Sequence, residues 1–203
     1  MRILAIAIAL ALFAVTSVLA QEQTKITMKT FSVVSSFAPP PWANGPDVVA
    51  VSELHQNQGT TPTGGIFFIW EAIPKGEKFE DWTTLYAVTA ETPLNGDVTA
   101  YMNGQINLFS EACTDVAVQI SNSTLPNQEI FLIFCESYKD RPELGEVAFF
   151  NMQLVNQTLV KNYLHYRRQS FSIQDASEPP FPLEQMRDAI YRVGQLRIVP
   201  ASN

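Results

Sequence analysis

The sequence predicts an α+β fold in which a mainly antiparallel β-sheet is covered by helices. Runs rich in β-branched and aromatic residues recur along the chain and are separated by short polar connections, as expected for strands. Apolar residues follow helical spacing twice, once near the middle of the chain and once close to its C-terminus. A sheet with short connections needs helices to cover its buried faces, so both observations point to the same class.

The first twenty residues have the pattern of a signal peptide. Arg2 supplies a positive charge, residues 3–14 carry no polar side chain, and Val18 and Ala20 are small residues suited to cleavage after Ala20. The alternative is an uncleaved membrane anchor, but the apolar run is shorter than the roughly 18 residues that a span requires. We therefore expect a periplasmic or secreted bacterial protein.

Cleavage removes 20 of the 203 residues and leaves 183, a length that suits one folded domain after export. Residues 21–47 form an N-terminal strand and a Pro-rich connector, and residues 48–203 form a single α+β domain. The net charge of −7 becomes −8 when Arg2 leaves. This charge disfavours nucleic acid and anionic membranes as partners, and we expect no membrane span in the mature chain.

The two cysteines, Cys113 and Cys135, predict a disulfide because export brings thiols into an oxidising compartment. The alternatives are a reactive thiol or a metal pair, but the close spacing typical of redox and zinc sites is missing. A bridge closing a loop of about 20 residues should stabilise the fold by roughly 3 kcal/mol.

The elements expected in the first half are mostly strands. Residues 38–42, with three prolines, read as a rigid extended connector, and residues 56–65 as a polar loop. Strands are expected at 26–34, 48–54, 66–70 and 85–90. Asp97 is a suitable N-cap for a helix. Its apolar stripe consists of Val98, Met102, Ile106, Phe109 and Cys113.

The second half should contain an antiparallel meander followed by a helix. Strands are expected at 116–120, 130–136, 146–154 and 159–167. The continuous apolar run at 130–136 predicts a central strand buried on both faces. A terminal helix begins near Leu183 and ends near Gly194, and residues 196–199 are the last element.

No linear catalytic motif is present. The chain has two histidines, His55 and His165, and lacks HExxH, GxSxG, P-loop and dinucleotide-binding patterns. We expect no metal and no cofactor. A Ser-His-Asp site assembled in space stays open, because such triads are not recognisable from linear order.

One strip of residues is unusual in an acidic protein. On the strand at 159–167, alternate side chains share a face, which brings together Lys161, Tyr163, His165 and Arg167. This cationic and aromatic strip could bind a carboxylate, a phosphate or an acidic partner. The alternative is a solvated sheet face whose charges pair with neighbouring residues such as Glu146.

The segment 68–85 contains two tryptophans around a corner. Pro74 and Gly76 predict a turn between two strands. Trp70 and Trp82 are then interpreted as structural anchors of the core, and the alternative is a binding platform.

Several blocks resemble an uncharacterised group of secreted or periplasmic proteobacterial proteins. The first block consists of Trp70-Glu71, Pro74, Gly76-Glu77 and Asp81-Trp82-Thr83. Asp81 stands where that pattern has Asn. The later blocks are Phe134-Cys135, 145–150, Tyr163 to Arg167 and 182–186. The group in turn resembles the PsbP-like α-β-α sandwich. The resemblance implies this architecture and an exported location, and it carries over no catalytic residue.

These observations favour an exported, non-enzymatic protein that binds another protein or a small anionic ligand. One alternative is a hydrolase or transferase whose site is hidden in the linear sequence. Another is a periplasmic immunity or inhibitor protein, which the acidic charge and the small disulfide-bonded fold would suit.

Overall fold

An antiparallel sheet dominates the computed structural model, which describes residues 25–43, 45, 47–121, 123, 125–174 and 180–202. The predicted signal peptide and its cleavage position lie outside these residues. The described strands are β1 (Ile26–Thr30), β2 (Val33–Phe37), β3 (Ser52–Thr60), β4 (Ile66–Pro74), β5 (Thr84–Thr92), β6 (Val116–Ser121), β7 (Gln128–Cys135), β8 (Leu144–Val155), β9 (Thr158–Gln169) and β10 (Arg197–Pro200). The described helices are α1 (Val48–Val51), α2 (Val98–Ala112) and α3 (Leu183–Gly194). The sheet-dominated α+β class is confirmed.

The larger sheet has the strand order β3-β4-β5-β9-β8-β7-β6. The consecutive strands β7, β8 and β9 pair antiparallel, which confirms the predicted meander. The prediction that residues 130–136 form the central strand is wrong, because β9 is central and β7 lies second from the edge. Its apolar run has another cause. Phe131 packs in the core on one face of the sheet and Leu132 in the core on the other.

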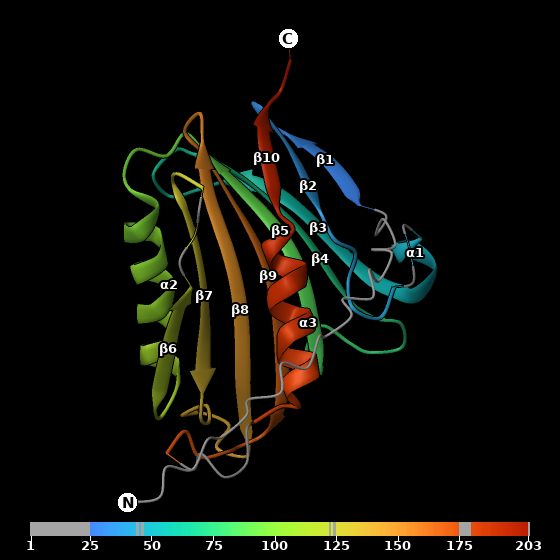
Figure 1. Cartoon of the computed structure of the whole chain (residues 1–203), viewed down its shortest axis with the longest axis vertical. Helices are drawn as coiled ribbons and strands as arrows, with labels where there is room; N and C mark the ends of the chain where they lie inside the picture. The colour runs from blue at the N-terminus through green and yellow to red at the C-terminus, as the bar shows by residue number, and fades with distance from the viewer. Residues whose placement is uncertain are drawn as a thin grey trace, which may run out of the picture.

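The two longer helices cover opposite faces of this sheet. Phe149 shares a core with Ala189 and Val193 of α3, whereas the next residue, Phe150, shares a core with residues of α2. Successive strand residues point to opposite faces, so we name these the α3 face and the α2 face. In Figure 1, α2 lies beside β6 and β7, and α3 crosses β8 and β9.

A smaller sheet, β1-β2-β10, completes the α3 face. The prediction of one strand over 26–34 is wrong, because the chain turns at Phe31, whose φ is 52°. The resulting hairpin places Val33 and Phe37 in the same core as Trp70. The connector after β2 is held by Tyr86, whose hydroxyl donates to the Ala38 carbonyl at 2.6 Å.

Residues 48–60 also differ from the expectation. The predicted strand at 48–54 begins as the short helix α1, because the Asp47 carboxylate accepts a hydrogen bond from the Ala50 N–H at 3.3 Å. The first half of the predicted loop at 56–65, residues 56–60, is part of β3, and residues 61–65 form the connection to β4. β3 lies at the edge of the sheet and most of its side chains are exposed, so polar residues are tolerated there.

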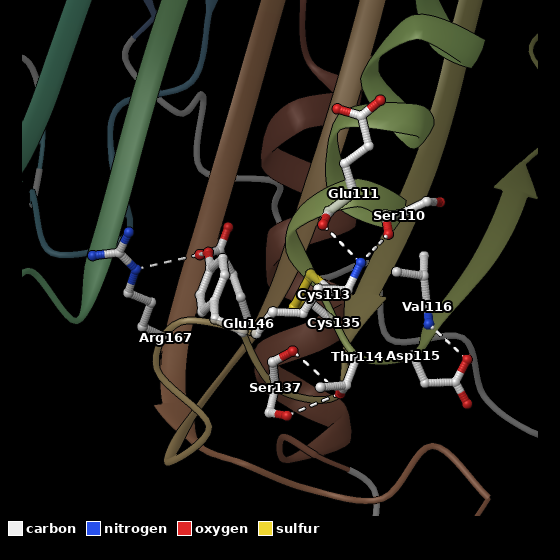
Figure 2. Close-up of a disulfide and its surroundings, with 12 residues drawn as sticks. Ser110, Glu111, Cys113, Thr114, Asp115, Val116, Cys135, Ser137, Glu146 and Arg167 are labelled. Carbon is white, nitrogen blue, oxygen red and sulfur yellow. Dashed lines mark hydrogen bonds and ion pairs between the residues drawn. A yellow bond between two sulfur atoms is a disulfide. The ribbon is translucent and has the colours of Figure 1, made fainter.

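The mid-chain helix agrees with its prediction. The Asp97 carboxylate accepts a hydrogen bond from the Thr99 N–H at 3.1 Å and caps α2. Cys113, directly after the helix, forms a disulfide with Cys135 at the end of β7, as predicted (Figure 2). None of the described helices combines the length and the apolar content that crossing a bilayer requires.

Candidate functional site

The α2 face is only partly covered by its helix. α2 packs mainly on β6, β7 and β8, and the neighbouring surface of β9, β5 and β4 contains three hollows. We call the one next to the C-terminal half of α2 the Trp82 hollow. Its volume is about 240 Å³. It is lined by Trp82, Leu108, Phe109, Ala112, Tyr138, Glu146, His165 and Arg167.

A buried carboxylate organises the floor of the Trp82 hollow. Glu146 of β8 is 2% exposed, yet it is ionic and lies in an otherwise apolar strand segment. Its Oε1 is 2.7 Å from His165 Nδ1, and its Oε2 accepts a hydrogen bond from Arg167 Nε at 3.3 Å. The Tyr138 hydroxyl also donates to Oε2. We call Glu146, Tyr138, His165 and Arg167 the Glu146 cluster.

The fold brings the members of this cluster together from three segments. Glu146 stands opposite Arg167 in the β8–β9 register, and on the other side it stands opposite Cys135 of β7. Tyr138 forms an isolated β-bridge with Cys113, the other half of the disulfide. In Figure 2, Glu146 is drawn between the disulfide and Arg167. The disulfide thus stabilises the segment that carries Tyr138.

The surroundings of Glu146 favour its charged form. Burial by itself raises the pKa of this carboxyl, but the charge and hydrogen bond of His165, the Tyr138 hydroxyl and the Arg167 charge together lower the pKa below its ordinary value. The pKa of Tyr138 is raised, first by burial and then by the Glu146 charge and hydrogen bond. The cluster therefore holds an ionised carboxylate and a neutral phenol at neutral pH.

His165 presents one ring nitrogen without a partner. An ionised Glu146 can only accept, so the hydrogen on His165 Nδ1 is directed at the carboxylate. The opposite nitrogen, Nε2, is buried and forms no hydrogen bond with the described residues. Aromatic rings surround the imidazole, with centroid distances of 5.1 Å to Phe150, 4.9 Å to Tyr163 and 6.0 Å to Phe109. A ligand atom in the Trp82 hollow could satisfy Nε2.

Trp82 forms the wall opposite α2. The Arg167 guanidinium lies over its ring, with Cζ 3.6 Å from the centroid, which is a cation–π contact. The corner before Trp82 is well fixed. Gly76 has φ 91° in the turn that follows Pro74, and Glu77 accepts hydrogen bonds from the Thr83 N–H at 2.8 Å and hydroxyl at 2.6 Å.

Trp70 and Trp82 lie on opposite faces of the sheet. Trp70 is buried on the α3 face, where its ring centroid is 6.0 Å from Phe37 and 6.3 Å from Tyr86. Trp82 is also buried, at 8% exposure, and packs with Ile73 in a small core of its own. Trp70 therefore lines none of these three hollows, whereas Trp82 is both a core residue and a wall of the candidate site.

The predicted cationic strip is divided by the structure. His165 and Arg167 line the Trp82 hollow, but Lys161 and Tyr163 line a second hollow farther along β9. Between them, the Tyr163 hydroxyl reaches across the sheet and donates to Glu71 at 3.3 Å. The four residues share a face but form two sites.

Sequence reasoning named Glu146 only as an ion-pair partner and missed Tyr138. A single charge inside the apolar segment 145–150 is the signal that could have identified Glu146 as a buried site residue. Nothing local marks Tyr138, because its contact with Glu146 depends on the loop after β7. The other histidine, His55, pairs with Glu71 at 2.9 Å in the third hollow and is exposed.

Among the residues that the structure describes, no group of three or more His, Cys, Asp or Glu side chains could hold a metal ion. The chain matches no protein-family model and no curated protein.

Proposed function

We propose that this protein is exported and binds a small ligand that combines an aromatic or apolar body with one carboxylate, in the Trp82 hollow. The observation that carries the proposal is the buried, unpartnered Nε2 of His165 beside the Arg167 guanidinium. A buried polar atom without a partner is costly, and a ligand that supplies the partner regains that free energy on binding.

The walls support the aromatic part of this ligand. Trp82, Phe109 and Leu108 provide apolar surface around the polar floor. Ligand sites commonly combine such walls with a few convergent polar groups. A volume of about 240 Å³ exceeds the roughly 150 Å³ of a cavity that holds benzene, so one ring with a short acidic substituent is a suitable size.

The charges support an anionic group. The Glu146 charge is balanced by Arg167, and the bond between them uses only Nε of the guanidinium. A protonated His165 would make the floor cationic and would donate from Nε2 to a carboxylate.

Isothermal titration with benzoate, and with neutral benzamide as the comparison, tests this proposal. Benzoate should bind and benzamide should bind at least about tenfold more weakly, since a charge-assisted hydrogen bond contributes roughly 1.5–3 kcal/mol. Arg167→Gln should weaken benzoate binding by a similar factor. Arg168→Gln is the matched control, because the Arg168 side chain is exposed and lies over Phe181. Equal binding of the two probes would reject the anionic ligand class.

Catalysis is the second candidate, and one observation favours it. Glu146 holds the His165 ring through Nδ1, as a carboxylate does for a catalytic histidine that acts as a general base. This leaves Nε2 free to take a proton. The residues lining the Trp82 hollow include no Ser, Thr or Cys, so an attacking group would have to be water. Hydrolysis of 4-nitrophenyl esters that disappears in His165→Gln but persists in His55→Gln would favour this function over binding alone.

Export and architecture complete the proposal. The disulfide supports an oxidising compartment. Helices on both faces of the sheet support the PsbP-like α-β-α arrangement that the sequence resemblance implies. Expression of the full chain in a bacterium, followed by N-terminal sequencing of the periplasmic fraction, should find Gln21 first. A cytoplasmic protein that keeps Met1 or Arg2 would contradict export.

A further inference from the structure

The second hollow on the α2 face surrounds a lysine. We call it the Lys161 hollow, and its volume is about 330 Å³. Lys161 stands opposite Thr89 of β5 on one side and opposite Met152 of β8 on the other. The hollow is lined by Thr61, Phe67, Phe68, Ile69, Thr89, Ala90, Glu91, Leu159, Lys161 and Tyr163. Most of these side chains are apolar or aromatic.

Two polar groups in this hollow lack partners. With the described residues, the Lys161 ammonium forms no ion pair within 4.0 Å and no hydrogen bond. The Thr89 hydroxyl is buried and also has no hydrogen-bond partner in the described part of the chain. Glu91 lies on the same wall, two residues from Thr89 on β5, and acts on Lys161 through its charge.

The surroundings make the amine more available than that of a surface lysine. Burial lowers the pKa of Lys161, and the Glu91 charge offsets only part of that effect. The neutral amine is the nucleophilic form of lysine, and desolvation in an apolar pocket is a known way of activating it. A lysine in this setting reacts with carbonyl groups more readily than an exposed one.

We propose that Lys161 forms a reversible imine with an uncharged aldehyde that has a small aromatic or apolar body. The Nζ lone pair attacks the carbonyl carbon, and one proton moves from nitrogen to the carbonyl oxygen to give a carbinolamine. The hydroxyl of this adduct then takes up a proton and leaves as water, forming a C=N bond with one proton still on nitrogen, and release of that proton gives the neutral imine. Glu91 is placed to exchange these protons, and the Thr89 hydroxyl to hydrogen-bond the carbinolamine oxygen.

The uncharged class follows from the charges of the hollow. Glu91 shares the wall with Lys161, so a carboxylate on the ligand would meet a like charge. A neutral carbonyl avoids this repulsion. The site is separate from the Trp82 hollow, since the lining residues of the two hollows do not overlap.

Reductive trapping tests the proposal in the unmodified protein. Benzaldehyde and cyanoborohydride are added at pH 7, and peptide mass spectrometry follows benzylation at each lysine. Exposed Lys29 and Lys78 serve as internal controls. Lys161 should be modified several-fold faster than either control, because burial lowers the pKa of Lys161 and leaves more free amine at pH 7. Modification of Lys161 at or below the rate of Lys29 would overturn the proposal.

A second aldehyde tests the ligand class. Glyoxylate is an aldehyde with a carboxylate. The rate of modification of Lys161 relative to that of Lys29 should therefore be several-fold lower with glyoxylate than with benzaldehyde. Equal ratios would overturn the uncharged class. Lys161→Arg keeps the charge and removes the nucleophile, so the fast-labelled peptide should disappear, and a fast component that persists would contradict the assignment.

Discussion

The Arg167 guanidinium lies 3.6 Å from the centroid of the Trp82 ring, and its Nε donates to the buried Glu146 carboxylate. One side chain thus connects the corner before β5 to the floor of the candidate site. The backbone supports this connection, because the Arg167 N–H donates to the Thr83 carbonyl at 2.8 Å. Substitution of Trp82 or Glu146 should therefore affect both the stability of the fold and ligand binding.

Trp82→Ala should lower the free energy of unfolding by about 3–5 kcal/mol, because it removes a buried aromatic side chain and leaves a cavity. Urea denaturation measures this loss. Trp82→Phe keeps part of the packing, so its free energy of unfolding should fall by less. Unchanged stability in Trp82→Ala, together with lost benzoate binding, would instead make Trp82 a binding platform and not a core anchor.

Glu146→Gln should make stability less dependent on acidic pH. The folded-state pKa of Glu146 lies below its ordinary value of 4.5, so its stabilising contribution is present above that value. This contribution is lost as the pH falls through the lower, folded pKa.

The free-energy difference between wild type and Glu146→Gln should consequently be largest near pH 7, at about 3 kcal/mol, and should shrink below pH 4. Urea midpoints at pH 7, 5 and 3.5 provide the comparison. The exposed Glu143→Gln is the matched control. A difference that stays constant down to pH 3.5 would show that Glu146 is not a charge-paired carboxyl with a lowered pKa.

Replacing both cysteines by serine should destabilise the protein by roughly 3 kcal/mol, the value expected for a loop of about 20 residues. The variant should also weaken benzoate binding, because Tyr138 pairs with the backbone of Cys113. Thermal unfolding and titration on the same samples check both effects. If the variant and the oxidised wild type were equally stable, the disulfide would not stabilise the fold.

Tyr86→Phe tests how the N-terminal segment is held on the α3 face. The Tyr86 hydroxyl donates to the Ala38 carbonyl and accepts from Asn162 Nδ2 at 2.8 Å. Its loss leaves the buried Ala38 carbonyl without this donor and Asn162 Nδ2 with only its longer hydrogen bond to the Ala87 carbonyl at 3.4 Å, and should cost about 1–3 kcal/mol. Tyr191→Phe, at an exposed position, should change little. If the two variants had the same urea midpoint, this hydrogen-bond chain would not contribute to stability.

The elements with local signals could be predicted from the sequence. Asp97 and the apolar stripe that follows it identify α2, because capping and helical periodicity involve neighbours in the chain. Asn156 has a positive φ, which asparagine tolerates, so the turn between the strands expected at 146–154 and 159–167 also has a local signal. The disulfide was predictable because the chain contains two cysteines.

The missed features depend on distant contacts. Phe31 adopts a positive φ without the Gly or Asn that usually announces such a turn, so the β1–β2 hairpin looked like one strand. β3 is polar because it lies at an edge, which only the sheet order reveals. The Glu146 cluster depends on the β8–β9 register and on the loop carrying Tyr138, so its geometry could not be derived from spacing along one strand.

The ¹⁵N NMR signals of the histidine side chains test the central claim most directly. The chain has only two histidines, so His55→Gln assigns the spectrum by elimination. Benzoate should shift the His165 Nε2 resonance in a saturable manner and leave that of His55 nearly unchanged, whereas benzamide should have a much smaller effect. A His165 signal that stays fixed at millimolar benzoate, or equal shifts at both histidines, would contradict ligand binding in the Trp82 hollow.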